Sequence, residues 1–211
     1  MLERIERDVF KHKPDWLLIS CGVNDVNHGN RGVALEDYQK NLRAMVDQAL
    51  EAGIKVMILT ATMITEDPDY VNNKKLSAYN DFLRELAAER KTLLADLNVL
   101  MQQEVAAKEN KKENLLTVDG VHMNGLGNQM MASGILQAFG VPSGEIARFK
   151  EFWNDLPNAM PVQVGQIGRV SVSVNQYQAL RKLALQNQLN LADLMQQNWD
   201  KMLSGMLTPA P

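Results

Sequence analysis

The stretch WLLISCG, residues 16–22, is a short apolar run that ends in glycine. A continuous run of this length is typical of a strand that is buried on both faces of a parallel sheet. Two similar runs follow it, IKVMILT at residues 54–60 and TLLADL at residues 92–97. Segments with helical periodicity separate the three runs, so right-handed crossovers and a parallel sheet are expected. The sequence therefore predicts a three-layer α/β/α domain.

Helical patterns surround these strands. Residues 36–52 carry one apolar stripe and are followed by Gly53, which suits a C-terminal cap. Apolar spacing between residues 76 and 86 predicts a second long helix. A short helix and a polar loop rich in Lys, Glu and Asn are expected after the third strand. Residues 124–140 predict a last helix, whose small side chains would let it lie close to the sheet.

Composition narrows the class of protein. The 211 residues are 45% hydrophobic and 22% charged, which is average for a globular domain. A net charge of −3 gives no basic field of the kind that nucleic acid attracts. The single cysteine, Cys21, excludes an intramolecular disulfide framework. The apolar runs are too short to span a bilayer, and the first residues show no signal-peptide pattern, which leaves the localisation open.

Two polar motifs stand at positions suited to chemistry. CGVND, residues 21–25, follows the first predicted strand, and ligands bind at the carboxyl ends of strands in open α/β sheets. DGVHMN, residues 119–124, precedes the last helix of the domain. It places Asp119 three residues before His122, and an aspartate that orients a histidine is half of a hydrolytic triad.

Together, in this order, the two motifs resemble those of the SGNH or GDSL-type hydrolase superfamily. KPDWLLISCGVND, residues 13–25, is similar to its third conserved block, and DGVHMN is similar to its fifth. Met123 stands where the family usually has proline. The resemblance covers residues 1–140. It implies a flavodoxin-like parallel sheet and an ester hydrolase, of the carboxylesterase or carbohydrate O-acetylesterase type, that needs no cofactor or metal.

The resemblance also implies a role for each motif residue. A serine would attack the ester and form an acyl-enzyme, with His122 as general base and then general acid. Asp119 would orient His122, and Asn24 would donate an N–H to the oxyanion. Gly22 and Asp25 would support the loop, Asp25 through hydrogen bonds to the backbone. The expected partner is a small ester or an acetylated carbohydrate, and nothing in the sequence selects among such esters.

The nucleophile is the missing part. The family carries its serine in a first block, Gly-Asp-Ser, and an oxyanion glycine in a second block, and neither block is present. None of the seven serines lies in a Gly-Asp-Ser or G-x-S-x-G setting; they are Ser20, Ser77, Ser133, Ser143, Ser171, Ser173 and Ser204. We therefore expect Met1 to be an internal methionine of a longer protein. This chain alone would lack the serine nucleophile. Its first strand would be an exposed edge, which favours poor folding, strand swapping or dimerisation.

The chain divides into residues 1–142, a partial hydrolase domain, residues 143–161, a connecting arm, and residues 162–211, an extension for packing or dimerisation. In the extension, RVSVSV at residues 169–174 alternates like a half-exposed strand, and two helices follow. Asn190 is placed to cap the second helix.

This extension resembles a ribbon–helix–helix module, in which a strand pairs with its copy from another subunit and reads DNA. The strand would then present Arg169, Ser171 and Ser173. From residue 161 on, however, the chain has four basic and two acidic residues, which is a thin electrostatic footprint for nucleic acid.

Other interpretations stay open. Cys21 lies one residue before Gly22 and is an alternative nucleophile. Asp25, His28, Asp119 and His122 include metal-ligand types, although no ligand spacing supports a metal site. A non-catalytic remnant that binds acylated ligands or a partner is an alternative to the enzyme. So is a DNA-binding or assembly protein that acts through its C-terminal module.

Overall fold

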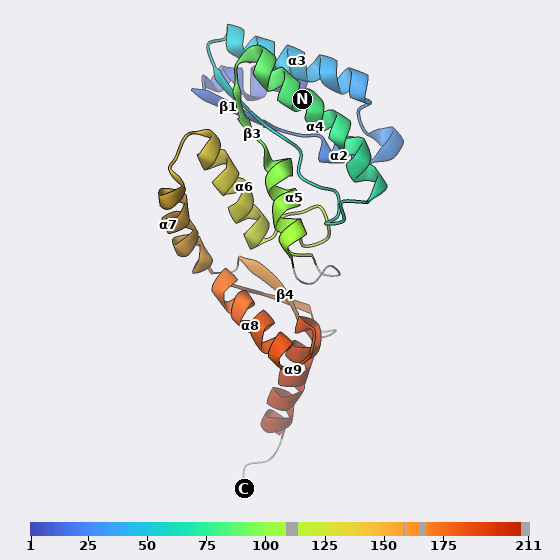
Figure 1. The fold of residues 1–211 in the computed structure, drawn as a ribbon, viewed down its shortest axis with the longest axis vertical. Coiled ribbons are helices and arrows are strands. Elements are labelled where there is room, and N and C mark those ends of the chain that lie inside the picture. Colours follow the sequence, from blue (N-terminus) through green and yellow to red (C-terminus); the bar gives the residue numbers. More distant parts are fainter. Residues whose placement is uncertain (109–113, 158, 165–167, 208–211) are drawn as a thin grey trace.

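The computed structural model describes residues 1–108, 114–157, 159–164 and 168–207 (Figure 1). Three parallel strands form its main sheet in the order β1-β2-β3. Their bounds are Trp16–Ser20 for β1, Lys55–Leu59 for β2 and Leu93–Ala95 for β3. Each lies within a run that the sequence marks as a strand. The polar loop predicted after the third strand falls partly outside the described residues.

Helices occupy most of the remaining chain. The α-helices are α1 Ile5–Asp8, α2 Val23–Asn27, α3 Leu35–Glu51, α4 Val71–Arg90, α5 Leu97–Ala107, α6 Gly125–Ala138, α7 Ser143–Asn154, α8 Val174–Gln186 and α9 Leu191–Leu207. Short 3₁₀ helices in the described ranges are η1 Leu2–Arg4, η2 Phe10–His12 and η3 Gly29–Arg31. None of the helices in the described ranges is both long and apolar enough to cross a membrane.

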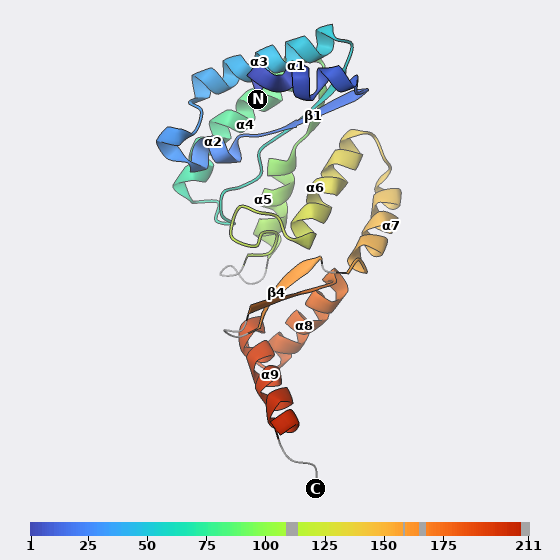
Figure 2. The same ribbon diagram turned by 180° about the vertical axis from the view of Figure 1, so that it is seen from behind.

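The central strand β2 shows why the sheet is covered on both faces. Successive side chains of a strand point to opposite faces. Val56 and Ile58 pack into the cluster formed with α3 and α4, whereas Met57 and Leu59 pack with residues of α6. The two views show α3 and α4 together on one side and α6 on another (Figures 1 and 2). The predicted three-layer α/β/α arrangement is confirmed.

Strand β1 is an edge of the sheet that the described residues form. Its Leu18 side chain is 40% exposed, which is unusual for a leucine within a parallel strand. At the start of the strand, the Trp16 ring meets Phe139, just after α6, edge to face with 4.9 Å between ring centroids. An aromatic contact therefore anchors one end of β1, while its outer edge has no strand beside it among the described residues.

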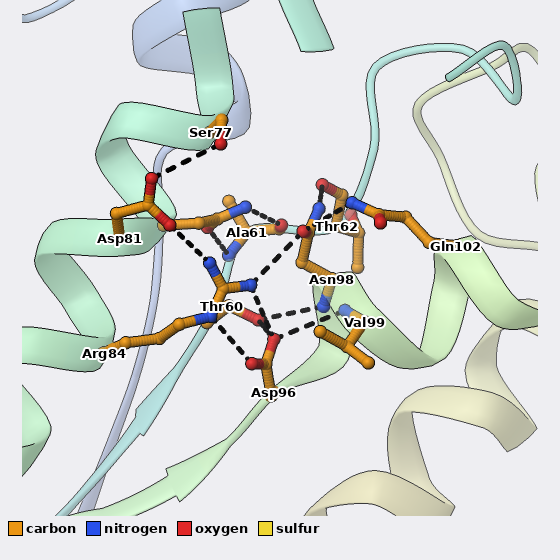
Figure 3. Close-up of polar contacts among 11 residues, drawn as sticks. Thr60, Ala61, Thr62, Ser77, Asp81, Arg84, Asp96, Asn98, Val99 and Gln102 are labelled. Carbon is orange, nitrogen blue, oxygen red and sulfur yellow. Dashed lines mark hydrogen bonds and ion pairs between the residues drawn. The ribbon is translucent and has the colours of Figure 1, made fainter. Parts of the chain in front are cut away.

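A polar network fixes the carboxyl ends of β2 and β3 (Figure 3). Thr60 Oγ1 donates to Asp96 at 2.9 Å, and the Arg84 guanidinium reaches the same carboxylate at 2.8 and 3.1 Å. Asp96 also accepts the Val99 N–H at the start of α5. Burial alone would raise the pKa of Asp96, but the hydrogen bonds from Arg84 and Thr60 lower it. This edge of the sheet is held in a defined geometry.

The C-terminal region has two features that the sequence patterns did not predict. The segment predicted as a connecting arm contains a helix, α7, which follows Pro142 and buries Ile146. The strand predicted to pair with another subunit is β5, Gly168–Val172, and it pairs antiparallel with β4, Met160–Val164, of the same chain. A β-hairpin followed by α8 and α9 results, seen in orange and red in Figure 1.

The two helix starts in this region are well defined. Ser173 is not an outward strand residue, because it caps α8 in a capping box with Gln176. Asn190 Oδ1 accepts the Asp193 N–H at 2.9 Å, so the predicted cap of the last helix is present. Arg169 and Ser171 are exposed on β5. The resemblance implied that this strand pairs with its copy from another subunit, whereas β5 pairs with β4 of its own chain.

Candidate active site

Gly22 follows β1 and has a backbone conformation that favours glycine. Its φ is +126°, and a Cβ built there would lie 3.0 Å from the Ala61 Cβ and 3.3 Å from the Tyr38 hydroxyl oxygen. Both the backbone and the close neighbours therefore exclude a larger side chain. This lets the chain turn directly from β1 into α2, so that the next residues stand at the carboxyl edge of the sheet.

Asn24 and Asp25 lie in the first turn of α2. Asn24 is exposed, and in the described ranges its side-chain amide makes no hydrogen bond, so its N–H groups are available to a ligand. The backbone hydrogen bonds predicted for the Asp25 carboxylate do not occur among the described residues. The loop is held instead by close packing, since a Cβ at Gly32 would lie 1.9 Å from the Asp25 carbonyl oxygen.

Asp119 and His122 form a compact pair. The His122 Nδ1 lies 2.7 Å from Asp119 Oδ2, and Asp119 Oδ1 accepts the backbone N–H groups of His122 at 2.9 Å and Val121 at 3.0 Å. This is an Asx-type turn that places the carboxylate and ring side by side. With Nδ1–H donated to Asp119, the other ring nitrogen is left to accept a proton. The His122 side chain is 80% exposed.

The surroundings of Asp119 favour its charged form. The backbone N–H of His122, then its ring, then the Val121 N–H lower the pKa of Asp119 well below its ordinary value. A carboxylate that stays ionised in this way can stabilise an imidazolium beside it. The pair thus has the electrostatics of a base and its orienting partner.

Asp119→Asn is expected to flatten the response of stability to acid. A carboxyl whose pKa is lower in the folded state contributes stability above its unfolded pKa, about 3.9, and loses it as the pH falls through the folded value. The wild type should therefore lose more unfolding free energy than Asp119→Asn between about pH 7 and about pH 2.5. Urea unfolding of both proteins at the two pH values measures this difference. Equal losses would contradict the ion-pair geometry.

The turn with Asp119 and His122 is docked against the segment after β2. The Thr65 N–H donates to the Gly120 carbonyl at 2.7 Å, and a Cβ at Gly120 would lie 3.3 Å from the Thr65 Cα. Val121 packs against the apolar cluster that also receives Cys21 and Val23. Both motifs therefore border the same large apolar cluster. No hydrogen bond or ion pair links Asn24 to Asp119 or His122 in the described ranges.

The structure also shows a residue that the sequence patterns miss. Glu66, in the loop between β2 and α4, is buried and accepts hydrogen bonds from residues 115–117, just before Asp119. It lies in the run TEDPD, residues 65–69, which has the composition of an ordinary turn. Its partners are about fifty residues away in sequence, so no local pattern marks it.

The surroundings of Cys21 disfavour the thiolate form of its side chain. Burial raises the pKa of its thiol to about 11, and the Tyr38 hydroxyl lies 3.8 Å from Sγ. A thiol with this pKa is almost entirely protonated near neutral pH, and the thiolate is the reactive form. Over the described residues, no group of three or more His, Cys, Asp or Glu side chains is placed to hold a metal ion.

A cavity of about 330 Å³ adjoins the segment before Asp119. Thr117 and Val118 line it from the side of that segment, and Val162, Arg169 and Asn190 line it from the C-terminal hairpin and helices. The C-terminal extension therefore packs beside the segment that leads to Asp119.

Comparison with known proteins places these motifs in context. Residues 1–130 match the model of the GDSL-like lipase/acylhydrolase family. An acetylxylan esterase from Geobacillus stearothermophilus is 24% identical over 144 residues, which cover 65% of this chain and 64% of the esterase. The chain thus spans less than two thirds of the length of that relative.

Solved structures share the fold. An α/β hydrolase from the metagenome of Lake Arreo, Spain, gives a TM-score of 0.59 at 26% identity, over 66% of each chain. The G. stearothermophilus acetylxylan esterase gives a TM-score of 0.60 at 24% identity, over 67% of this chain and 68% of the esterase. Crystal structures of three catalytic mutants of that esterase carry alanine in place of a serine, an aspartate or a histidine, and the aspartate precedes the histidine by three positions.

Proposed function

Because this chain belongs to the GDSL-like lipase/acylhydrolase family, we propose that it carries the general base of a serine ester hydrolase. The observation that supports this most is the Asp119–His122 pair, whose ring nitrogen and carboxylate oxygen are 2.7 Å apart. The esterase from G. stearothermophilus has a catalytic aspartate and histidine with the same spacing in sequence. His122 and Asp119 take the corresponding roles in this proposal.

The chemistry follows from the groups at the site. His122 accepts the proton of a serine hydroxyl as the oxygen attacks the ester carbonyl, and then gives it to the leaving alcohol. Asp119 stabilises the imidazolium that forms between these steps. The Asn24 amide, exposed and without a hydrogen bond in the described part, donates to the oxygen of the tetrahedral intermediate. Water then attacks the acyl-enzyme by the same route, with His122 again as base.

The serine itself is proposed to come from outside these 211 residues. No serine of the chain lies in a nucleophile motif, and none in the described ranges forms a hydrogen bond with the His122 ring. Ser77 and Ser133 bind within their own helices, and Ser173 caps α8. The proposal therefore assigns the base, its orienting partner and an oxyanion donor to this chain, and assigns the nucleophile to another part of the protein.

We propose acetyl esters of carbohydrates as the first substrate class to test. The similar esterase is an acetylxylan esterase. This likeness is what supports the choice, because the 80% exposure of His122 is that of a chain without the proposed nucleophile segment.

Turnover by the intact protein tests the proposal. The protein is purified from its natural host, its mass is measured, and hydrolysis of 4-nitrophenyl acetate and of acetylated xylo-oligosaccharides is followed. We expect release of acetate from both, with a burst of nitrophenol that reports the acyl-enzyme. Hydrolysis of neither substrate, in a protein that is folded and contains a Gly-Asp-Ser segment, would contradict it.

A further inference from the structure

The segment that leads to Asp119 is held by one buried carboxylate, that of Glu66. The Glu66 side chain is 1% exposed. Its Oε2 accepts the backbone N–H of Leu115 at 2.6 Å, and its Oε1 accepts those of Leu116 at 2.7 Å and Thr117 at 2.8 Å. Three successive backbone donors thus converge on a single side chain from a distant part of the sequence.

Two side-chain donors complete this set. Thr117 Oγ1 donates to Glu66 Oε1 at 2.9 Å, and the buried Lys108 Nζ lies 3.4 Å from Oε2. A carboxylate only accepts hydrogen bonds, so it matches a pocket in which every partner donates. A buried charge is tolerated when it is both paired and hydrogen-bonded, and Glu66 meets both conditions.

The contacts continue from Glu66 to the turn that carries the base. Besides donating to Glu66, Thr117 Oγ1 accepts the backbone N–H of Gly120 at 3.1 Å. The Gly120 carbonyl in turn accepts the N–H of Thr65 at 2.7 Å. Thr65 therefore binds Gly120 directly, and its neighbour Glu66 is linked to Gly120 through Thr117. Gly120 lies between Asp119 and His122 in the sequence.

The loop that carries Glu66 is itself fixed. Asn73 of α4 accepts the Ile64 N–H and donates to the carbonyls of Ile64 and Asp67, each at 2.8 Å. Within this loop Thr65 has a φ of +61°, which a β-branched residue adopts only when its surroundings impose it. Backbone outliers of this kind cluster near functional sites. The strained residue is the one that binds Gly120.

We propose that Glu66 is a positioning residue for His122. It acts through Thr117 and Gly120 to hold the turn in which Asp119 binds the ring, and so keeps the ring proton on Nδ1. The inference rests on the proposed function for the role of His122 as base. The placement of the ring proton can be measured without turnover, so the two ideas fail independently.

Ring nitrogen signals of ¹⁵N-histidine protein provide the test, at a pH high enough for the rings to be neutral. The chain has three histidines, so His12 and His28 serve as internal references. Glu66→Gln puts an amide N–H₂ where the backbone N–H groups point, and Thr117→Val removes the hydroxyl at constant shape. Thr117→Ser restores the hydroxyl. Glu85→Gln, an exposed change on α4, is the matched control.

In Glu66→Gln and Thr117→Val, we expect the His122 signals to move towards those of a free imidazole, with His12 and His28 unchanged. Amide exchange over residues 115–122 should rise about tenfold or more relative to α3, because charge-assisted hydrogen bonds are lost. Thr117→Ser and Glu85→Gln should match the wild type. If Glu66→Gln does not fold, the His122 signals of Thr117→Val test the proposal.

Unchanged His122 signals in a folded Thr117→Val protein would overturn the proposal. So would a rise in amide exchange that is equal in residues 115–122 and in α3, because Glu66 would then serve general stability alone. Full activity in His122→Ala would instead contradict the proposed function. The ring nitrogen signals would still test whether Glu66 positions the His122 ring.

Discussion

Replacing His122 by alanine is expected to lower kcat/KM for a chromogenic acetate ester by about 10³- to 10⁴-fold in the intact protein. The loss corresponds to roughly 4–5.5 kcal/mol of transition-state stabilisation. The reason is that Asp119 already holds Nδ1 at 2.7 Å, so the exposed second nitrogen is the group that can accept the serine proton. Without the ring, the serine hydroxyl has no base at this site among the described residues.

The matched control is His12→Ala. His12 is exposed and ends η2, so it precedes the amino end of β1, whereas Gly22 and Asn24 follow the carboxyl end of that strand. We expect its activity and unfolding curve to match the wild type. Asp119→Asn should keep the ring but lose its orientation, with a drop comparable to that of His122→Ala. A His122→Ala protein with the wild-type rate would remove His122 from the mechanism.

The sequence predicts the parts of this molecule whose signals are local. The buried strands are continuous apolar runs, and the spacing of Asp119 and His122 is itself the geometry of their turn. Asn190 is recognisable as a cap because its partner, Asp193, is three residues away. In each case the residues that make the contact lie within one or two turns of chain, where pattern and structure coincide.

The remaining features depend on distant partners. In the sequence, Glu66 resembles an ordinary turn residue, because the backbone N–H groups that donate to it lie about fifty positions later. The strand β5 alternates as predicted, but only the structure shows that its partner is β4 of the same chain. Asp25 is an Asx residue in a loop, yet close packing at Gly32 holds that loop. Such choices are made by tertiary packing, which single-sequence patterns do not encode.

Asn80→Ala is expected to lower the unfolding free energy by about 3–4 kcal/mol. Asn80 is fully buried on α4, accepts the Ala61 N–H at 2.8 Å and donates to the Ala61 carbonyl at 2.9 Å. Its removal leaves a buried backbone donor and a buried acceptor without partners, each worth about 1–3 kcal/mol. In a chain of this size the melting temperature should fall by roughly 10 °C.

Asn72→Ala is the matched control, because Asn72 is on the same helix, is partly exposed and makes no hydrogen bond in the described ranges. Its unfolding free energy in urea should stay within about 0.5 kcal/mol of the wild type. Asn80→Asp separates the two hydrogen bonds, since a carboxylate still accepts the Ala61 N–H but cannot donate to its carbonyl. The aspartate variant should be destabilised at least as strongly as alanine at neutral pH, because it also buries an unpaired charge. If both variants unfold like the Asn72 control, Ala61 does not depend on Asn80. Other residues would then hold Ala61 against Gly22, and so position Asn24.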